Sequence, residues 1–267
     1  MLTLIDTHSH IDGEEFSEDF NDVVRRAKEA NVEKIFIPNI NTETIGRILE
    51  VCAINPGVLY PMLGLHPEDV KGTEYKKALD CLKGILDQHN AQDSELQKFI
   101  AIGEIGIDLY WDKTYKNEQI KAFERQIEWS IEYNLPIMIH TREAHREVVE
   151  IISKYKAENI RGVFHCFTGN TEEAEELMTF NNFMLGIGGV VTFKKSTLAE
   201  TIKKAIPLSK IVLETDSPYM APVPYRGKRN ESSFITEVAK KIADILQCST
   251  EDVAEQTTKN ALSIFKI

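Results

Sequence analysis

Eight short apolar runs alternate with longer amphipathic segments along this chain of 267 residues, and this alternation constrains the fold more than any other feature. Short apolar runs bounded by polar residues are typical of strands that are buried in a parallel sheet. Each run is therefore expected to form one strand. The runs cover residues 2–6, 34–38, 58–63, 99–103, 136–140, 162–165, 183–187 and 211–213.

The segments between these runs have the periodicity of amphipathic helices. In residues 117–133, for example, Ile120, Phe123 and Ile127 recur at the spacing of one helix face. A polar stretch at 90–97 is expected to be a surface loop. Helices are predicted over residues 16–30, 42–54, 75–89, 117–133, 143–155, 171–178 and 196–205, with two more at 233–246 and 250–265.

A strand followed by a helix, repeated eight times, predicts an α/β fold of the (β/α)8 TIM barrel class. Barrels of this kind often occupy a chain of this length, so residues 1–267 are expected to form one domain. The competing fold is a doubly wound open sheet. Such a sheet would more naturally carry a glycine-rich phosphate loop after an early strand, and the sequence has none.

The location of the protein is predicted from what the sequence lacks. It has no apolar stretch near eighteen residues and no recognisable signal peptide, and its four cysteines are scattered. We therefore expect a cytoplasmic protein with reduced thiols, no membrane association and no obligate protein partner. The net charge of −11 argues against a broad duplex-binding surface. It leaves room for a small anionic substrate, because bound metal ions reverse the local charge.

Residues able to bind a metal ion follow one predicted strand after another. His8 and His10 come directly after the first run, and residues two apart on a strand point the same way. A single histidine at a strand end is more often an ordinary hydrogen-bonded residue. Several together, all expected at the rim where barrel enzymes place their chemistry, favour a metal centre instead. The others are His66, Glu104, His140, His165 and Asp216.

This mixture of imidazoles and carboxylates suits divalent zinc, manganese, magnesium, nickel or iron. A carboxylate such as Glu104 can bridge two ions, and two ions about 4 Å apart would act on both the attacking and the leaving oxygen. Of the two acids after the last strand, we assign Asp216 to a metal and Glu214 to packing or to support of the ligands. Arg226, Lys228 and Arg229 form a basic loop that either binds a phosphate or pairs with nearby acids.

Seven motifs, in order along essentially the whole chain, resemble the TatD family of metal-dependent hydrolases. The resemblance implies an amidohydrolase-type barrel, two divalent ions per chain and deoxyribonuclease activity. Two departures from the family pattern, Glu143 and Ser232, remove no ligand. By motif the ligands would be His8, His10, Glu104, His140, His165 and Asp216, with Glu104 shared and His66 nearby toward the substrate. The motifs cover residues 8–10, 64–67, 102–108, 140–142, 165–169, 214–218 and 226–231.

The predicted function is the hydrolysis of phosphodiester bonds in DNA, in single strands or at strand ends. A metal-activated water would attack, with Asp216 orienting it and taking its proton, and with Glu104 between the ions. Arg142, Arg226 and Arg229 would stabilise charge on the phosphoryl oxygens. One ion would be held by His8, His10, Asp216 and Glu104, and the other by His140, His165 and Glu104.

Two alternatives remain open on the sequence. The same metal pair could hydrolyse a small amide, ester or lactone, for which the basic loop would not be needed. A protein of another class, a non-catalytic binding protein on a barrel fold, would tolerate the loss of ligands. All six predicted ligands are present, which favours an enzyme.

Overall fold

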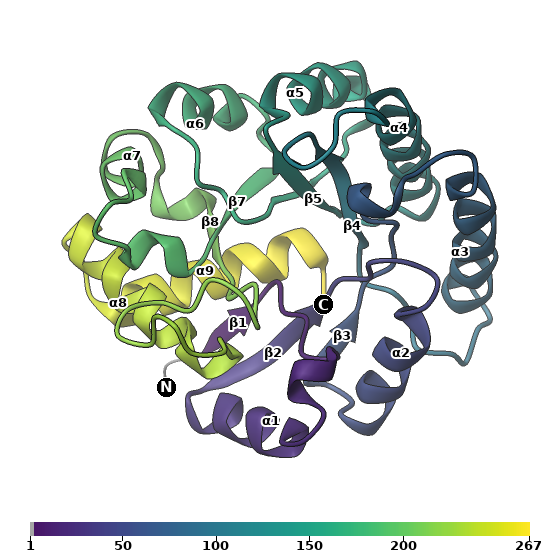
Figure 1. Cartoon of the computed structure of the whole chain (residues 1–267). Coiled ribbons are helices and arrows are strands. Elements are labelled where there is room, and N and C mark those ends of the chain that lie inside the picture. The colour runs from purple at the N-terminus through teal and green to yellow at the C-terminus, as the bar shows by residue number, and fades with distance from the viewer. Residues whose placement is uncertain (1–2) are drawn as a thin grey trace. The chain divides into compact units, whose positions relative to one another are not determined.

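The computed structural model describes residues 3–267, so Leu2 of the first predicted strand lies outside the described residues. Over this range eight strands alternate with helices (Figure 1). No helix among residues 3–267 has the length and apolar character needed to cross a bilayer. The strands are β1 (Leu4–Asp6), β2 (Val32–Ile37), β3 (Leu59–Pro61), β4 (Ile102–Asp108), β5 (Ile137–Arg142), β6 (Gly162–Phe164), β7 (Phe183–Ile187) and β8 (Ile211–Leu213).

Each predicted helix has a counterpart in the structure, with shifts of a few residues at some ends. The largest shift is at the first helix, because Phe16 belongs to a separate single turn. The helices are α1 (Phe20–Glu29), α2 (Ile45–Ile54), α3 (Tyr75–Asn90), α4 (Lys116–Tyr133), α5 (His145–Lys154), α6 (Thr171–Met178), α7 (Leu198–Ala205), α8 (Ile235–Leu246) and α9 (Thr250–Phe265).

The described chain divides into two compact units. Unit 1 contains the stretch that ends at Ile37, residues Gly57–Leu59 and residues His165–Ile267. Unit 2 contains residues Pro38–Pro56 and Tyr60–Phe164. The first unit therefore holds β1, β2, β7 and β8, whereas β4, β5 and β6 belong to the second.

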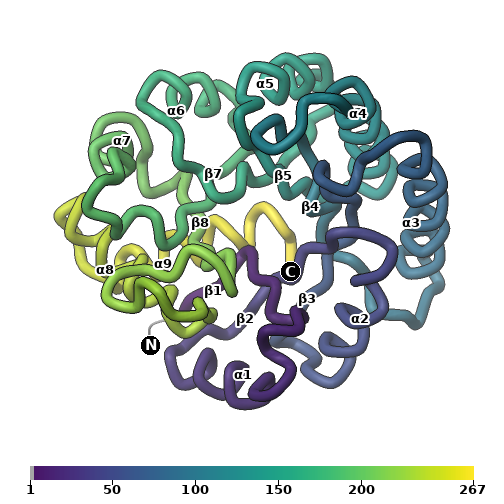
Figure 2. Tube along the Cα trace, viewed as in Figure 1, coloured from purple at the N-terminus to yellow at the C-terminus, as the bar shows by residue number. Residues whose placement is uncertain are grey.

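In unit 1, β8 lies between β7 and β1. Strands β7 and β8 are parallel, and Leu213 at the end of β8 accepts a backbone hydrogen bond from Thr7 at 3.0 Å. Strands β1 and β2 are parallel as well, with Asp6 opposite Ile35. Helix α9 packs against β1 and β8, and Figure 2 traces it beside these two strands. The carboxyl ends of the strands share one edge, so the residues that follow them are neighbours.

In unit 2, β4, β5 and β6 are parallel and adjacent in that order. On its other side β4 is bonded to the segment after β3, where Gly103 donates to the Leu63 carbonyl at 2.9 Å. Helix α4 packs against β4, and Phe123 and Ile127 on its inner face are fully buried. Glu104 and His140 therefore lie on adjacent strands.

The predicted bounds of the fourth strand, 99–103, were wrong. The strand β4 starts three residues later and continues to Asp108, with all seven residues buried, so Glu104 lies within it and not after it. Glycines and acidic residues are rare in strands, so the sequence pattern of residues 103–108 did not indicate a strand. Gly106 is required where β5 approaches, since a Cβ there would lie 2.0 Å from the His140 carbonyl oxygen.

Candidate metal centre

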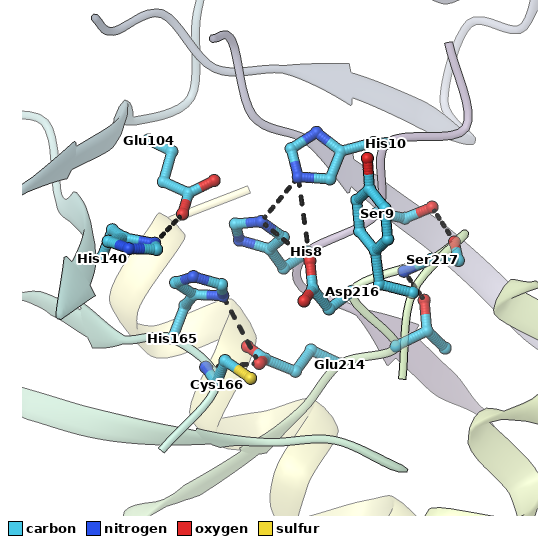
Figure 3. A network of polar contacts seen from close by, with 12 residues as sticks. His8, Ser9, His10, Glu104, His140, His165, Cys166, Glu214, Asp216 and Ser217 are labelled. Atoms are coloured by element: carbon cyan, nitrogen blue, oxygen red, sulfur yellow. Dashed lines mark hydrogen bonds and ion pairs between the residues drawn. The ribbon is translucent and has the colours of Figure 1, made fainter. Parts of the chain in front are cut away.

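Three ligand-type side chains meet in unit 1, at the ends of β1 and β8. The Nε2 atoms of His8 and His10 are 3.3 Å apart, and each lies 3.8 Å from Oδ1 of Asp216 (Figure 3). The main chain fixes this arrangement beyond the strands. The Asp216 N–H donates to the His8 carbonyl at 2.9 Å, and the His10 N–H donates to that of Ser217 at 2.8 Å.

The spacing of these atoms fits a bound ion. Ligand atoms about 2 Å from a tetrahedral ion are about 3.3 Å from one another. The three distances in the cluster, 3.3, 3.8 and 3.8 Å, are close to that value. His165 belongs to the same group, because it offers a ligand atom within 4.8 Å of those of His8 and Asp216. The rings of His8 and His165 stack at 3.9 Å.

Glu214 supports His165. Its carboxylate is fully buried, and Oε1 accepts the Cys166 N–H at 2.5 Å and lies 3.6 Å from Nδ1 of His165 (Figure 3). The other oxygen, Oε2, makes no hydrogen bond within residues 3–267. That oxygen faces Gly186, where any Cβ would lie 2.1 Å from it. A buried carboxylate beside an imidazole restricts the orientation of the ring, which is consistent with the supporting role assigned to Glu214.

A second buried acid, Asp6, holds the main chain beneath the cluster. Its carboxylate accepts the N–H of Thr215 at 2.9 Å and the hydroxyl of the same residue at 2.6 Å. Burial raises the pKa of Asp6 to about 7, against hydrogen bonds that lower it. Sequence reasoning missed this residue, although it is the acid that ends the first apolar run, two residues before His8.

A second group of ligand-type side chains lies in unit 2, where Glu104 is the central residue. Its Oε1 is 2.8 Å from Nδ1 of His140 and 3.4 Å from Nε2 of His66 (Figure 3 shows the first contact). The two imidazole nitrogens are 3.3 Å apart. Glu104 and His66 are buried, and His140 is nearly so.

The second nitrogen of each ring distinguishes the two imidazoles. Nε2 of His140 lies 2.9 Å from Oδ2 of Asp108 and can donate a proton to it, and a ring protonated only there would leave the Nδ1 lone pair facing Glu104. A cation bound by both groups would make that contact attractive. Nδ1 of His66 instead accepts the Glu68 N–H at 3.2 Å, so its Nε2 carries the proton and is a donor. With Nε2 protonated, His140 would offer its Nδ1 to a metal ion, whereas His66 offers a hydrogen-bond donor.

Asp108 is the other residue that sequence reasoning missed, and it closes the buried 102–108 motif. Burial alone would raise the pKa of Asp108, but the hydrogen bond from His140 and the charge of Arg142 hold it below its usual value. The carboxylate is thus ionised and can accept the His140 proton.

Each cluster lies within one unit, with His8, His10, His165 and Asp216 in unit 1 and His66, Glu104 and His140 in unit 2. The structure thus places His165 beside His8. The predicted sharing of Glu104 by two ions, and the predicted grouping of His140 with His165, join residues of both units and stay predictions.

The two arginines of the basic loop are engaged by their own unit. The Arg229 guanidinium bonds both oxygens of Asp19 at 2.8 Å, which is the pairing with a nearby acid that the sequence left open. Arg226 donates to the Ala221 carbonyl at 3.1 Å and lies 3.9 Å from the ring of Phe193. Their contact with a phosphate stays a prediction.

Comparison with known proteins gives the family. The model of the TatD related DNase family matches residues 5–266. The chain is 39% identical over 267 residues to the uncharacterized metal-dependent hydrolase YabD of Bacillus subtilis, covering 99% of both. It is 31% identical over 276 residues to YcfH of Escherichia coli strain K12, another uncharacterized metal-dependent hydrolase, covering 100% of this chain and 97% of that one.

A solved structure confirms the fold class. The chain is similar to the TatD homologue YJJV of Escherichia coli K12, with a TM-score of 0.89 and 29% identity over all of both chains. With its alternating parallel strands and helices, it has the predicted α/β fold of the (β/α)8 TIM barrel class. Because the family model spans nearly all residues and the relatives align over their full length, the chain belongs to the TatD family of metal-dependent hydrolases.

Proposed function

We propose that this hydrolase cleaves phosphodiester bonds in single-stranded DNA or at DNA strand ends, with two divalent ions bound per chain. The observation that carries the proposal is the pair of clusters in which ligand-type atoms of histidines and carboxylates lie within 4.8 Å of one another. The family description, TatD related DNase, supports DNA as the substrate. The proposed ligands are His8, His10, His165 and Asp216 in unit 1, with Glu104 and His140 in unit 2.

Divalent ions in these clusters would acidify a water molecule and polarise the phosphate. Asp216 would orient that water and accept its proton, since its carboxylate is 14% exposed at the open side of its cluster. Glu104 is almost completely buried and would keep His140 in position. His66 would donate its Nε2 proton to the substrate, and Arg142 would bind a phosphoryl oxygen.

The proposal includes a cytoplasmic location. The four cysteines are scattered along the sequence and form no Cys-x-x-Cys pair, which agrees with a reducing compartment.

The test combines metal analysis with the Asp216→Asn variant. Reconstituted wild-type protein should approach two ions per chain. The variant keeps the shape of the side chain but loses its charge, so turnover of single-stranded DNA should fall by about 100-fold or more while the protein stays folded. The matched control is Asp80→Asn on the exposed side of α3, which should leave turnover unchanged.

Substrate comparison separates the alternatives. Efficient cleavage of an amide or lactone, with no cleavage of DNA, would support a hydrolase of small molecules and contradict the proposed nuclease activity. Wild-type turnover that persists in Asp216→Asn at saturating metal would refute the role of Asp216. Binding without turnover of any of these substrates would favour the non-catalytic protein.

A further inference from the structure

Two large aromatic side chains follow β4 and are left in solvent. Trp111 is 71% exposed and Tyr110 is 50% exposed. The two rings meet edge to face, with their centroids 4.7 Å apart. Tryptophan is usually well buried, and exposed apolar side chains that lie together are typical of binding sites.

A guanidinium group completes this aromatic surface. Arg142, the last residue of β5, lies 3.8 Å from the ring centroid of Tyr110 and 5.4 Å from that of Trp111. Within residues 3–267 its guanidinium forms no ion pair and no hydrogen bond. The contacts with the rings leave its N–H groups available for an anion. These three side chains are called the stacking platform below.

The platform is built at a fixed distance from the Glu104–His140 cluster of unit 2. Asp108 makes this link, because its Oδ1 accepts the Tyr110 N–H at 2.9 Å while its Oδ2 holds His140 at 2.9 Å. The main chain is tied a second time where Leu109 donates to the Arg142 carbonyl at 2.9 Å. One carboxylate thus positions both a proposed ligand and the start of the platform.

We propose that the stacking platform binds an unpaired nucleobase of the DNA strand being hydrolysed, an inference that rests on the proposed function. Bases of single strands stack on aromatic rings and on arginine planes, whatever their sequence. The guanidinium would in addition contact the phosphate attached to that nucleotide. In an intact duplex the faces of the bases are covered by their neighbours, so the platform selects frayed or single-stranded DNA.

The kinetic test uses metal-loaded protein and two oligonucleotides of equal length, one ordinary and one with abasic sites at its terminal positions. Trp111→Ala should raise KM for the ordinary strand about tenfold, within the range measured for base stacking. The KM for the abasic strand should stay near the wild-type value. Ile54→Ala on α2, at a site that is 62% exposed, is the control and should change neither value. Equal effects on both strands, or none, would overturn the inference.

A binding test separates failure of the platform from failure of the proposed function. The chain has two tryptophans, and the other, Trp129, is buried. A phosphorothioate oligonucleotide, which resists hydrolysis, should therefore quench the fluorescence of Trp111 when a base stacks on it. The quenching should disappear in Trp111→Phe and with an abasic strand. An absence of quenching in the wild-type protein would contradict the platform even if the protein cleaves DNA.

Discussion

At the residue scale, the group bonded to the second nitrogen of an imidazole decides what the ring can do. From the sequence, His66 and His140 are both histidines that follow a predicted strand. Only the family motifs assigned His66 to the substrate and His140 to a metal ion. In the structure the two rings differ, since Nε2 of His140 faces Asp108 and Nδ1 of His66 accepts the Glu68 N–H. Such contacts depend on side chains that meet only after folding, so residue spacing cannot predict them.

The first prediction at this scale concerns Asp108→Asn. The amide oxygen still accepts the Tyr110 N–H, but the amide NH₂ faces Nε2 of His140 and forces the ring into the other tautomer. Loss of a carboxylate behind a ligand imidazole typically costs 10- to 100-fold in metal affinity. Metal titration with a competing chelator should detect a loss of about that size. Asp112→Asn, in the loop that follows β4, is the control. An unchanged affinity in Asp108→Asn would contradict the role given to His140.

At the scale of elements, the predicted bounds are best where local interactions fix them. Helices α6 and α9 begin at the predicted residues, and each has a capping box, formed by Asn170 and Glu173 in α6. The bounds of β4 were predicted wrongly because its glycines and acidic residues are untypical of strands. They are accommodated by the close approach of β5, which is a tertiary contact that the local sequence does not reveal. The candidate ligands could be selected from the sequence because most of them follow a strand, whereas the acids Asp6 and Asp108 beside them resemble ordinary polar residues.

The loop after β8 is tied to the start of α1 by a network of charges. Asp19 binds Arg229 at 2.8 Å and Arg26 at 3.1 Å, and Arg26 also binds the buried Glu231 at 2.6 Å. Asn230 bonds the carbonyl of Thr215 at 2.8 Å. Because this loop continues from the segment that contains Asp216, the network holds the main chain around a proposed ligand.

This network predicts a loss of stability in acid. Hydrogen bonds from Arg229 lower the pKa of Asp19 from 3.8 to about 2. A lowered pKa stabilises the folded state above pH 3.8, and this contribution disappears as the pH falls toward 2. Since the Asp19 side chain is 32% exposed, solvent screening reduces it to about 1 kcal/mol.

Urea unfolding of Asp19→Asn checks this prediction. At pH 7 the variant should be less stable than the wild type, and the difference should shrink as the pH is lowered from 4 toward 2. Asp22→Asn removes a carboxylate that is 60% exposed on the same helix and should cost much less. An equal cost for both variants at pH 7 would argue against the network.

At the scale of the whole molecule, the fold class was predictable because eight strand–helix repeats leave few alternatives. The division into two units was not predictable from the sequence, since no change of composition marks the boundary between Ile37 and Pro38. Single-domain behaviour of residues 1–267 stays a prediction. The charge of the chain bears on function at this scale, because 42 acidic residues against 31 basic ones repel a long polyanion.

Local attraction must then come from bound ions and a few cationic side chains, which sets the last prediction. The rate of cleavage of single-stranded DNA should depend weakly on salt, because few phosphates are neutralised. The slope of log rate against log salt concentration changes by about 0.7 for each phosphate neutralised. We expect a slope of about −1.4 to −2.1, which corresponds to about two or three phosphates, and a smaller slope in Arg142→Ala. Cleavage should proceed from a strand end, so linear single strands should be degraded while closed circular duplex is spared. Rapid cutting of closed circular DNA would contradict the end-directed mechanism. A steep dependence of the rate on salt would mean that the strand lies along an extended basic surface, which the net charge of this chain does not favour.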